Sequence, residues 1–189
     1  MKKLIVSRYN ENIDWLSKIE FDYIIYNKGE HNLNYINFPN IGREADTYLN
    51  YIISNYDNLT DITIFSQGNP FDHCYNFIER VNNTSDLNHI IWLGTNWGPV
   101  TKNHVGGPGS IDLPLLELCK KLFNIQYDKS KTFTFSAGAQ YMVPKYFILN
   151  KSIEWWKYCY SIFLEYIETS PWAYERLWPE IFNYENISN

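Results

Sequence analysis

Cysteine is scarce in this chain, and the three cysteines present do not form a recognisable set. Cys74, Cys119 and Cys159 are widely separated in a sequence of 189 residues, and none belongs to a C-x-x-C pair. An odd number of separated cysteines fits reduced thiols better than a disulfide framework, and this spacing gives no support to a structural zinc site. We therefore expect a cytoplasmic protein that depends on its hydrophobic core.

Long apolar runs and basic clusters are also missing. The apolar run at residues 4–6 ends at Ser7 and is too short for the core of a signal peptide, and no stretch approaches the length of a membrane span. Lysine and arginine form pairs at most, as at Lys2 and Lys3, and the net charge is -5. Because nucleic-acid binding needs a basic footprint, the sequence predicts a soluble protein with neither a membrane span nor a nucleic-acid partner.

Three familiar catalytic motifs do not occur. The sequence has no G-x-G-x-x-G fingerprint, no P-loop and no G-x-S-x-G elbow. Dinucleotide-dependent redox chemistry, kinase-type phosphoryl transfer and esterase chemistry therefore lose their main sequence support.

The composition is that of a folded protein. Hydrophobic residues make up 45% of the chain and aromatic residues 18%, which excludes intrinsic disorder. A chain of this length buries one substantial core, and the sequence shows no internal repeat or low-complexity linker. We therefore expect a single domain over residues 1–189.

Strand-like and helix-like segments alternate along the sequence. Short apolar segments typical of strands occur at 4–7, 23–26, 61–65, 89–93 and 132–135. Helical periods occur at 12–16, 43–56, 71–81, 112–123, 153–167 and 172–182, and the glycine-rich segment 94–110 is expected to be a loop. This alternation predicts an α/β fold with a mostly parallel sheet flanked by helices and a helical C-terminal part.

Ligands of such sheets bind at the carboxyl ends of the strands, which directs attention to residues 7–11, 66–73 and 136–140. The second segment combines amide groups at Gln67 and Asn69 with Asp72 and His73, a set that could hold a phosphate or a metal ion. The alternative is structural. The two amides could complete the turn, while Asp72 favours the start of the following helix.

Arg43 opens a predicted helix after a glycine turn. An arginine at that place could contact a diphosphate through two hydrogen bonds, or it could form a surface ion pair with Glu44. Gly138, Ala139 and Gln140 follow a strand. Their small neighbouring side chains could let a ligand approach the backbone, or they could serve close helix packing.

Glu175 is embedded among aromatic residues of the last predicted helix. Such surroundings could raise the pKa of its carboxyl and make it a useful general base. Alternatively, Glu175 pairs with Arg176 or faces water, and the spacing alone favours that alternative.

Several segments together resemble a known family. Residues 6–11 with Trp15, 26–29, 39–44 with 47–49, and 65–73 resemble DUF3431, a family of uncharacterised proteins. In the second half, residues 138–141, a Trp/Tyr-rich helix and residues 174–179 follow each other in an order similar to the acceptor half of small GT-A glycosyltransferases. The resemblance implies a GT-A-like fold.

The same resemblance implies transfer of a sugar from a nucleoside-diphosphate donor, such as a UDP- or GDP-sugar, to a hydroxyl of a glycan or other acceptor. The expected substrate-binding residues are Arg8, Arg43, Gln67, Asn69, Gly138, Ala139 and Gln140. Glu175 would be the catalytic base of a displacement with inversion. GT-A enzymes usually bind Mn²⁺ through D-x-D, which this sequence lacks, so Asp72 and His73 are the nearest candidate ligands for Mn²⁺ or Mg²⁺.

Two other functions are compatible with the sequence. A non-catalytic module that binds carbohydrate or nucleotide would need neither a base nor a metal ion. A metal-dependent hydrolase could use Asp72, His73 and His104, and would release free sugar or phosphate without an acceptor.

Overall fold

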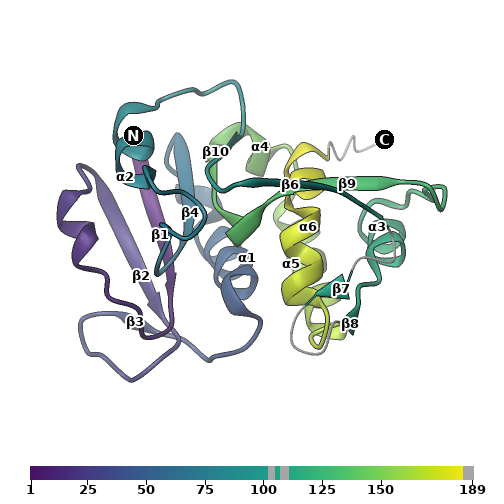
Figure 1. Ribbon diagram of the computed structural model, residues 1–189, viewed down its shortest axis with the longest axis horizontal. Helices are drawn as coiled ribbons and strands as arrows, with labels where there is room; N and C mark the ends of the chain where they lie inside the picture. The colour runs from purple at the N-terminus through teal and green to yellow at the C-terminus, as the bar shows by residue number, and fades with distance from the viewer. Residues whose placement is uncertain (102–104, 107–110, 185–189) are drawn as a thin grey trace.

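A six-stranded sheet, built from the first half of the chain and one later strand, forms one side of the molecule (Figure 1). The computed structural model describes residues 1–101, 105–106 and 111–184. The strand order is β3-β2-β1-β4-β10-β5, with β1 (Lys2–Arg8), β2 (Asp22–Asn27), β3 (Ile36–Asn37), β4 (Ile62–Gln67), β5 (Ile91–Trp92) and β10 (Tyr141–Pro144). Strands β1 to β4 pair in parallel and β10 is antiparallel to both neighbours. The predicted mostly parallel α/β sheet is confirmed.

The helices follow the periodic segments of the sequence. They are α1 (Arg43–Asn55), α2 (Phe77–Asn83), α3 (Leu115–Phe123), α4 (Lys145–Leu149), α5 (Ile153–Glu165) and α6 (Ser170–Asn183), with 3-10 turns at Asp14–Lys18, Tyr56–Asn58 and Ala137–Ala139. Helix α2 begins at Phe77 and not at residue 71, because the backbone N–H of Cys74 bonds to the carbonyl of Pro70 and closes a separate turn first. In the part of the chain described, no helix has the length and apolar character needed to cross a lipid bilayer.

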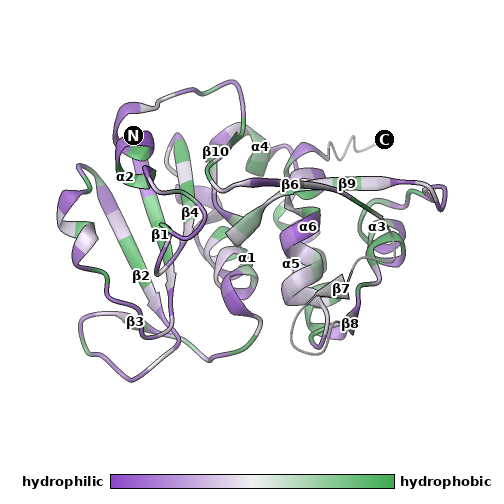
Figure 2. Cartoon of the chain, viewed as in Figure 1, coloured by the Kyte–Doolittle hydropathy of each residue, from purple (hydrophilic) through white to green (hydrophobic). Residues whose placement is uncertain are grey.

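The two faces of the sheet carry separate clusters of apolar side chains. Leu4 and Val6 of β1 point to one face, where they join Trp15 and the residues of α2. Ile5 points to the other face, where it joins Tyr48 of α1 and the second half of the chain. Because side chains alternate along a strand, a run of apolar residues covers both faces at once. In Figure 2 the strands of the sheet carry green apolar stretches, and many of the segments that connect them are purple, which marks polar residues.

The second half of the chain packs against the α1 face. An antiparallel pair, β6 (Asn96–Thr101) and β9 (Thr132–Ser136), runs beside α6, and a shorter pair joins β7 (Val105–Gly106) to β8 (Ile111–Asp112). The prediction of a loop over residues 94–110 was therefore wrong for β6 and β7. The glycine and proline residues around β6 indicated a loop. The segment is nevertheless a strand, because its backbone groups pair with β9, which is distant in the sequence.

Candidate functional site

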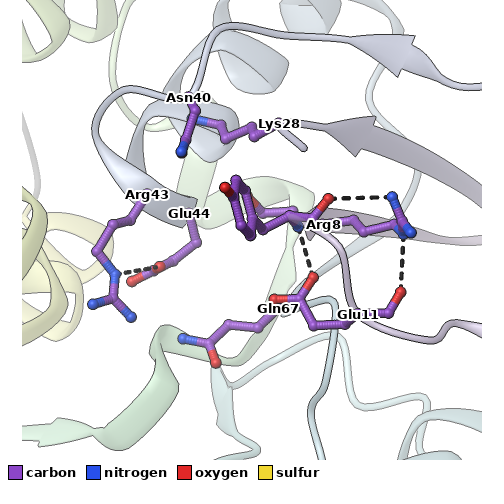
Figure 3. Close-up of a pocket in the computed structure, with 9 residues that line it drawn as sticks. Arg8, Glu11, Lys28, Asn40, Arg43, Glu44 and Gln67 are labelled. Atoms are coloured by element: carbon purple, nitrogen blue, oxygen red, sulfur yellow. Dashed lines mark hydrogen bonds and ion pairs between the residues drawn. The ribbon is translucent and has the colours of Figure 1, made fainter. Parts of the chain in front are cut away.

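A pocket of about 260 Å³ lies at the carboxyl ends of β1 and β4 (Figure 3). Nine residues line it: Ser7, Arg8, Tyr9, Glu11, Lys28, Asn40, Arg43, Glu44 and Gln67. From β1 the chain crosses one face of the sheet to β2, and from β3 it returns across the other face through α1 to β4. The pocket thus occupies the point where the winding reverses, which is where ligands of such sheets bind.

The start of α1 forms one wall of this pocket. Gly42 and Arg43 both have left-handed backbone angles, with φ of 63° and 52°. A Cβ atom at Gly42 would lie 2.4 Å from Cζ of Phe163, so the backbone passes against α5 where only glycine fits. This turn brings the first residues of α1 to the pocket, where the helix dipole favours a negatively charged group.

Arg43 is far more exposed than Lys28, the other pocket cation that forms an ion pair. Its side chain is 53% exposed, and its Nε lies 3.5 Å from Oε2 of Glu44. The guanidinium also lies 5.9 Å from the centre of the Trp172 ring on α6. The ion pair with Glu44 that the sequence suggested is present, yet it is long enough for Arg43 to exchange it for a bound anion.

Arg8 lines the pocket but directs its guanidinium elsewhere. It donates to Oδ1 of Asn27 at 2.5 Å and to the carbonyls of Tyr9 and Glu11 at 3.2 and 3.0 Å. In Figure 3 the guanidinium lies at the opposite end of the pocket from Arg43. In this structure Arg8 therefore braces the loop after β1.

Lys28 is a buried cation at the base of the pocket. Its Nζ donates to Asp46 at 2.7 Å and to the carbonyl of Ile41 at 2.6 Å. Burial lowers the pKa of Lys28, and the hydrogen bond and charge of Asp46 oppose that shift. Asp46 is fully buried and also accepts a hydrogen bond from Tyr160 at 2.9 Å. This network ties β2, α1 and α5 together beneath the pocket.

Two carboxylates line the pocket in different surroundings. Glu11 accepts a hydrogen bond from the backbone N–H of Tyr9 at 2.6 Å and covers Gly68, where a Cβ atom would lie 2.5 Å from its Oε2. The Glu44 side chain is only 7% exposed. Burial raises the pKa of Glu44, and the charge of Glu175 raises it further, whereas Arg43 opposes the rise.

Glu175 lies close to the pocket without lining it. Its Oε1 accepts a hydrogen bond from the backbone N–H of Gly138 at 2.8 Å, and its Oε2 forms a close ion pair with Arg176. The predicted alternative of pairing with Arg176 is therefore observed. Each oxygen retains a further lone pair, so these two contacts leave a role as base chemically open.

The segment Gly138 to Gln140 packs tightly against the turn after β4. Gly138 has φ of 78°, and a Cβ atom there would lie 2.5 Å from Cδ2 of His73. Ala139 also has a left-handed φ, of 52°, and Gln140 is fully buried and donates to the carbonyl of Pro70 at 3.1 Å. Close packing, one of the two interpretations of this segment, is thus what its contacts show.

The predicted metal ligands do not form a complete set. Asp72 is exposed, His73 lies against Gly138, and Asn69 accepts a long hydrogen bond of 3.4 Å from the backbone of Phe71. Within the described ranges, no group of three or more His, Cys, Asp or Glu residues is placed to bind a metal ion, and His104 lies outside those ranges. Protein metal sites use about three or four such ligands. Asp72 and His73 alone therefore do not make a metal site, and the proposed reaction contains no step at a metal ion.

Comparison with known proteins bears on the first half of the chain. Residues 4–91 match the DUF3431 family model, described as a protein of unknown function. The resemblance to DUF3431 is confirmed over these residues. All nine pocket residues lie within the DUF3431 match. No curated protein and no solved structure matches the chain.

Within the DUF3431 segment, Lys28 and Glu44 were not predicted as site residues. Charged side chains in a polar stretch are normally solvated, and no residue next to Lys28 indicates that its side chain is buried. One signal was available for Glu44. It lies four residues before Tyr48 and eight before Ile52, so it shares the helical face that α1 buries.

Proposed function

We propose that this protein transfers a sugar from a nucleoside-diphosphate donor to a hydroxyl acceptor. The observation that carries the proposal is the pocket at the winding reversal, where Arg43 and the first turn of α1 meet the end of β4. Guanidinium groups and helix N-termini both favour phosphate, and the crevice beside β1 is where wound sheets bind nucleotides.

A GT-A-like fold is part of this proposal. The strand order β3-β2-β1-β4 is the order of the first four strands in the doubly wound nucleotide-binding arrangement. The second half adds β6, β9 and α6 on the α1 side of the pocket, which is where an acceptor would approach. The wound sheet and these added elements could thus divide donor and acceptor binding between them, as the proposal requires.

In the donor complex, Arg43 would contact the diphosphate, and Gln67 would contact the donor from the end of β4. The remaining predicted contacts, from Arg8, Asn69 and Gly138 to Gln140, stay predictions. For Arg8 to contact a phosphate, its guanidinium would have to leave Asn27.

The reaction would be a direct displacement at the anomeric carbon. The acceptor oxygen forms a bond to that carbon and its proton passes to Glu175, while the bond from carbon to the diphosphate oxygen breaks and the diphosphate leaves with the electron pair. Attack and departure on opposite faces of the sugar invert the anomeric centre. Glu175 lies on α6, which also carries the Trp172 ring beside Arg43, and this supports the role.

A binding module is the second candidate, and one observation favours it. Both oxygens of Glu175 already have hydrogen-bond donors, which is the arrangement of a structural carboxylate. A module of this kind would bind the nucleotide sugar in the same pocket and release it unchanged.

Release of nucleoside diphosphate from a panel of UDP-, GDP- and dTDP-sugars, with oligosaccharide acceptors, tests the transferase proposal. Wild-type protein should release diphosphate with one donor, and Glu175→Gln should lower the rate by about 100-fold or more. Glu168→Gln is the matched control, because Glu168 is exposed beside α6. Binding without release in the wild type would favour the module, and normal rates in Glu175→Gln would refute the role of Glu175.

A further inference from the structure

Glu44 combines burial with access to the candidate ligand pocket. Its side chain is 7% exposed yet lines the pocket, and its described donors are the guanidinium of Arg43 at 3.5 Å and its own backbone N–H. A buried carboxylate normally has close donors on both oxygens, because an unpaired charge away from water is costly. Glu44 therefore has the surroundings of a carboxyl that easily carries a proton.

The neighbouring carboxyl, Glu175, has the opposite surroundings. The backbone N–H of Gly138 and the guanidinium of Arg176 both donate to it, and donors of this kind stabilise the ionised form. When two carboxyl groups share a site, different environments assign the proton to one of them. Here the geometry assigns it to Glu44.

The other charged and titratable groups around Glu44 come from three elements. Arg43 and Tyr48 lie on α1, Lys28 at the end of β2, and Glu175 and Arg176 on α6. Lys28 is already paired with Asp46, and Arg176 with Glu175. Arg43 is thus the cation that lies beside Glu44 in the pocket, and an incoming anion would compete for it.

We propose that Glu44 binds the diphosphate of the donor as a protonated carboxyl, so that binding of the anion is coupled to uptake of a proton. This inference rests on the proposed function, because it takes a diphosphate as the ligand of the pocket. An ionised Glu44 would repel the diphosphate and hold Arg43 away from it. A protonated Glu44 releases Arg43 and donates its own O–H to a phosphate oxygen.

The coupling has a thermodynamic consequence. If the bound anion favours protonated Glu44, the affinity for the anion must fall as pH rises through the pKa of Glu44. Substitution by glutamine keeps the shape and a hydrogen-bond donor but removes the ionisation. Glu44→Gln should therefore retain affinity at high pH, where the wild type loses it.

Calorimetric titration with inorganic pyrophosphate between pH 5.5 and 8.5 tests this inference on the full chain. The wild type should lose more affinity than Glu44→Gln over this range, so that the variant binds about tenfold more tightly at the upper end. Glu11→Gln is the matched control, since it removes a carboxylate from the same pocket but keeps Glu44. It should retain the wild-type dependence on pH.

Titrations of the wild type in two buffers of different ionisation enthalpy give a second measurement that needs no variant. We expect the complex to take up more protons on binding than the titration of pyrophosphate itself accounts for. Absence of that uptake, or equal pH dependence in the wild type and Glu44→Gln, would overturn the role of Glu44 but leave the anion pocket intact. Failure of pyrophosphate to bind at any pH would overturn the proposed diphosphate site as well.

Discussion

The backbone N–H of Gly138 donates a hydrogen bond to Glu175 at 2.8 Å. This contact joins the turn between β9 and β10 to α6, and the same carboxylate pairs with Arg176, which is only 9% exposed. The arrangement places a carboxylate from the end of the chain beside a pocket formed by its beginning. Its electrostatic effect reaches Glu44, whose pKa rises mainly through burial and further through the charge of Glu175.

Substitution of Glu175 should destabilise the fold more when both hydrogen-bond acceptors are lost than when only the charge is lost. Glu175→Gln retains an oxygen for the Gly138 N–H, whereas Glu175→Ala leaves that N–H and the Arg176 guanidinium without this partner. We expect a cost of about 1 kcal/mol for the glutamine variant and about 3 kcal/mol for the alanine variant. Urea unfolding of both variants measures the difference, and equal costs would contradict the structural role assigned to Glu175.

Glu44 should reduce the stability of the fold as pH rises. Its folded-state pKa lies above its usual value of 4.5, chiefly because of burial, so the folded state binds more protons than the unfolded state above that pH. The contribution of Glu44 to the free energy of unfolding is then full below about 4.5 and is lost as pH rises through the folded-state pKa. Glu44→Gln should gain stability relative to the wild type between pH 4.5 and 8 in urea unfolding. A constant difference between the two proteins would contradict the pKa shift.

The buried pair of Lys28 and Asp46 should be strongly sensitive to loss of one partner. Asp46→Asn removes the negative charge that faces the buried Lys28 ammonium and leaves a neutral amide in its place. We expect a loss of about 3 kcal/mol or more in the free energy of unfolding, because an unpaired buried charge is costly. Tyr160→Phe, which removes a hydrogen bond to the same carboxylate, should cost only about 1 kcal/mol. Similar costs for the two variants would show that the charge pair is not the main contribution.

The left-handed turn at the start of α1 gives a prediction about two adjacent residues. Gly42→Ala places a methyl group 2.4 Å from Phe163 at a φ of 63°, and should cost about 1–3 kcal/mol. Arg43→Gly relieves a positive φ, so it should be at least as stable as Arg43→Ala, which removes the same guanidinium. Thermal unfolding of the three variants tests the turn, and an Arg43→Gly variant less stable than Arg43→Ala would count against it.

Much of the fold was predictable because apolar residues recur with a clear helical period in several segments. The helix expected at residues 43–56 is α1, and the segments 153–167 and 172–182 correspond to α5 and α6. Strand β9 was predicted at its correct place but lies outside the main sheet, paired with β6. Strand β10, which was not predicted, takes that place in the sheet. Local sequence shows that a segment is extended, but pairing between distant strands depends on packing across the whole chain.

The site was predictable where strand ends determine it. Arg43 and Gln67 were placed near a common ligand from the rule that parallel strands bind at their carboxyl ends, and both line the pocket. Arg8 also lines the pocket, but its hydrogen bonds to the loop after β1 follow from the conformation of that loop. Burial of Lys28 depends on the packing of distant elements over α1, which no local pattern around that residue reveals, whereas Glu44 shares the periodic face that α1 buries.

We propose that the pocket beside β1 binds a nucleoside diphosphate sugar through Arg43. Thermal shifts with UDP, GDP, CMP and dTDP and their sugars, each with and without Mn²⁺, measure this directly, because a ligand bound only by the folded state raises the melting temperature. Wild-type protein should be stabilised by one nucleotide family, and Arg43→Ala should lose most of that shift, whereas a control at the exposed Lys120, Lys120→Ala, should retain it. No shift with any nucleotide would refute nucleotide binding, and an equal shift in Arg43→Ala would refute the role of Arg43.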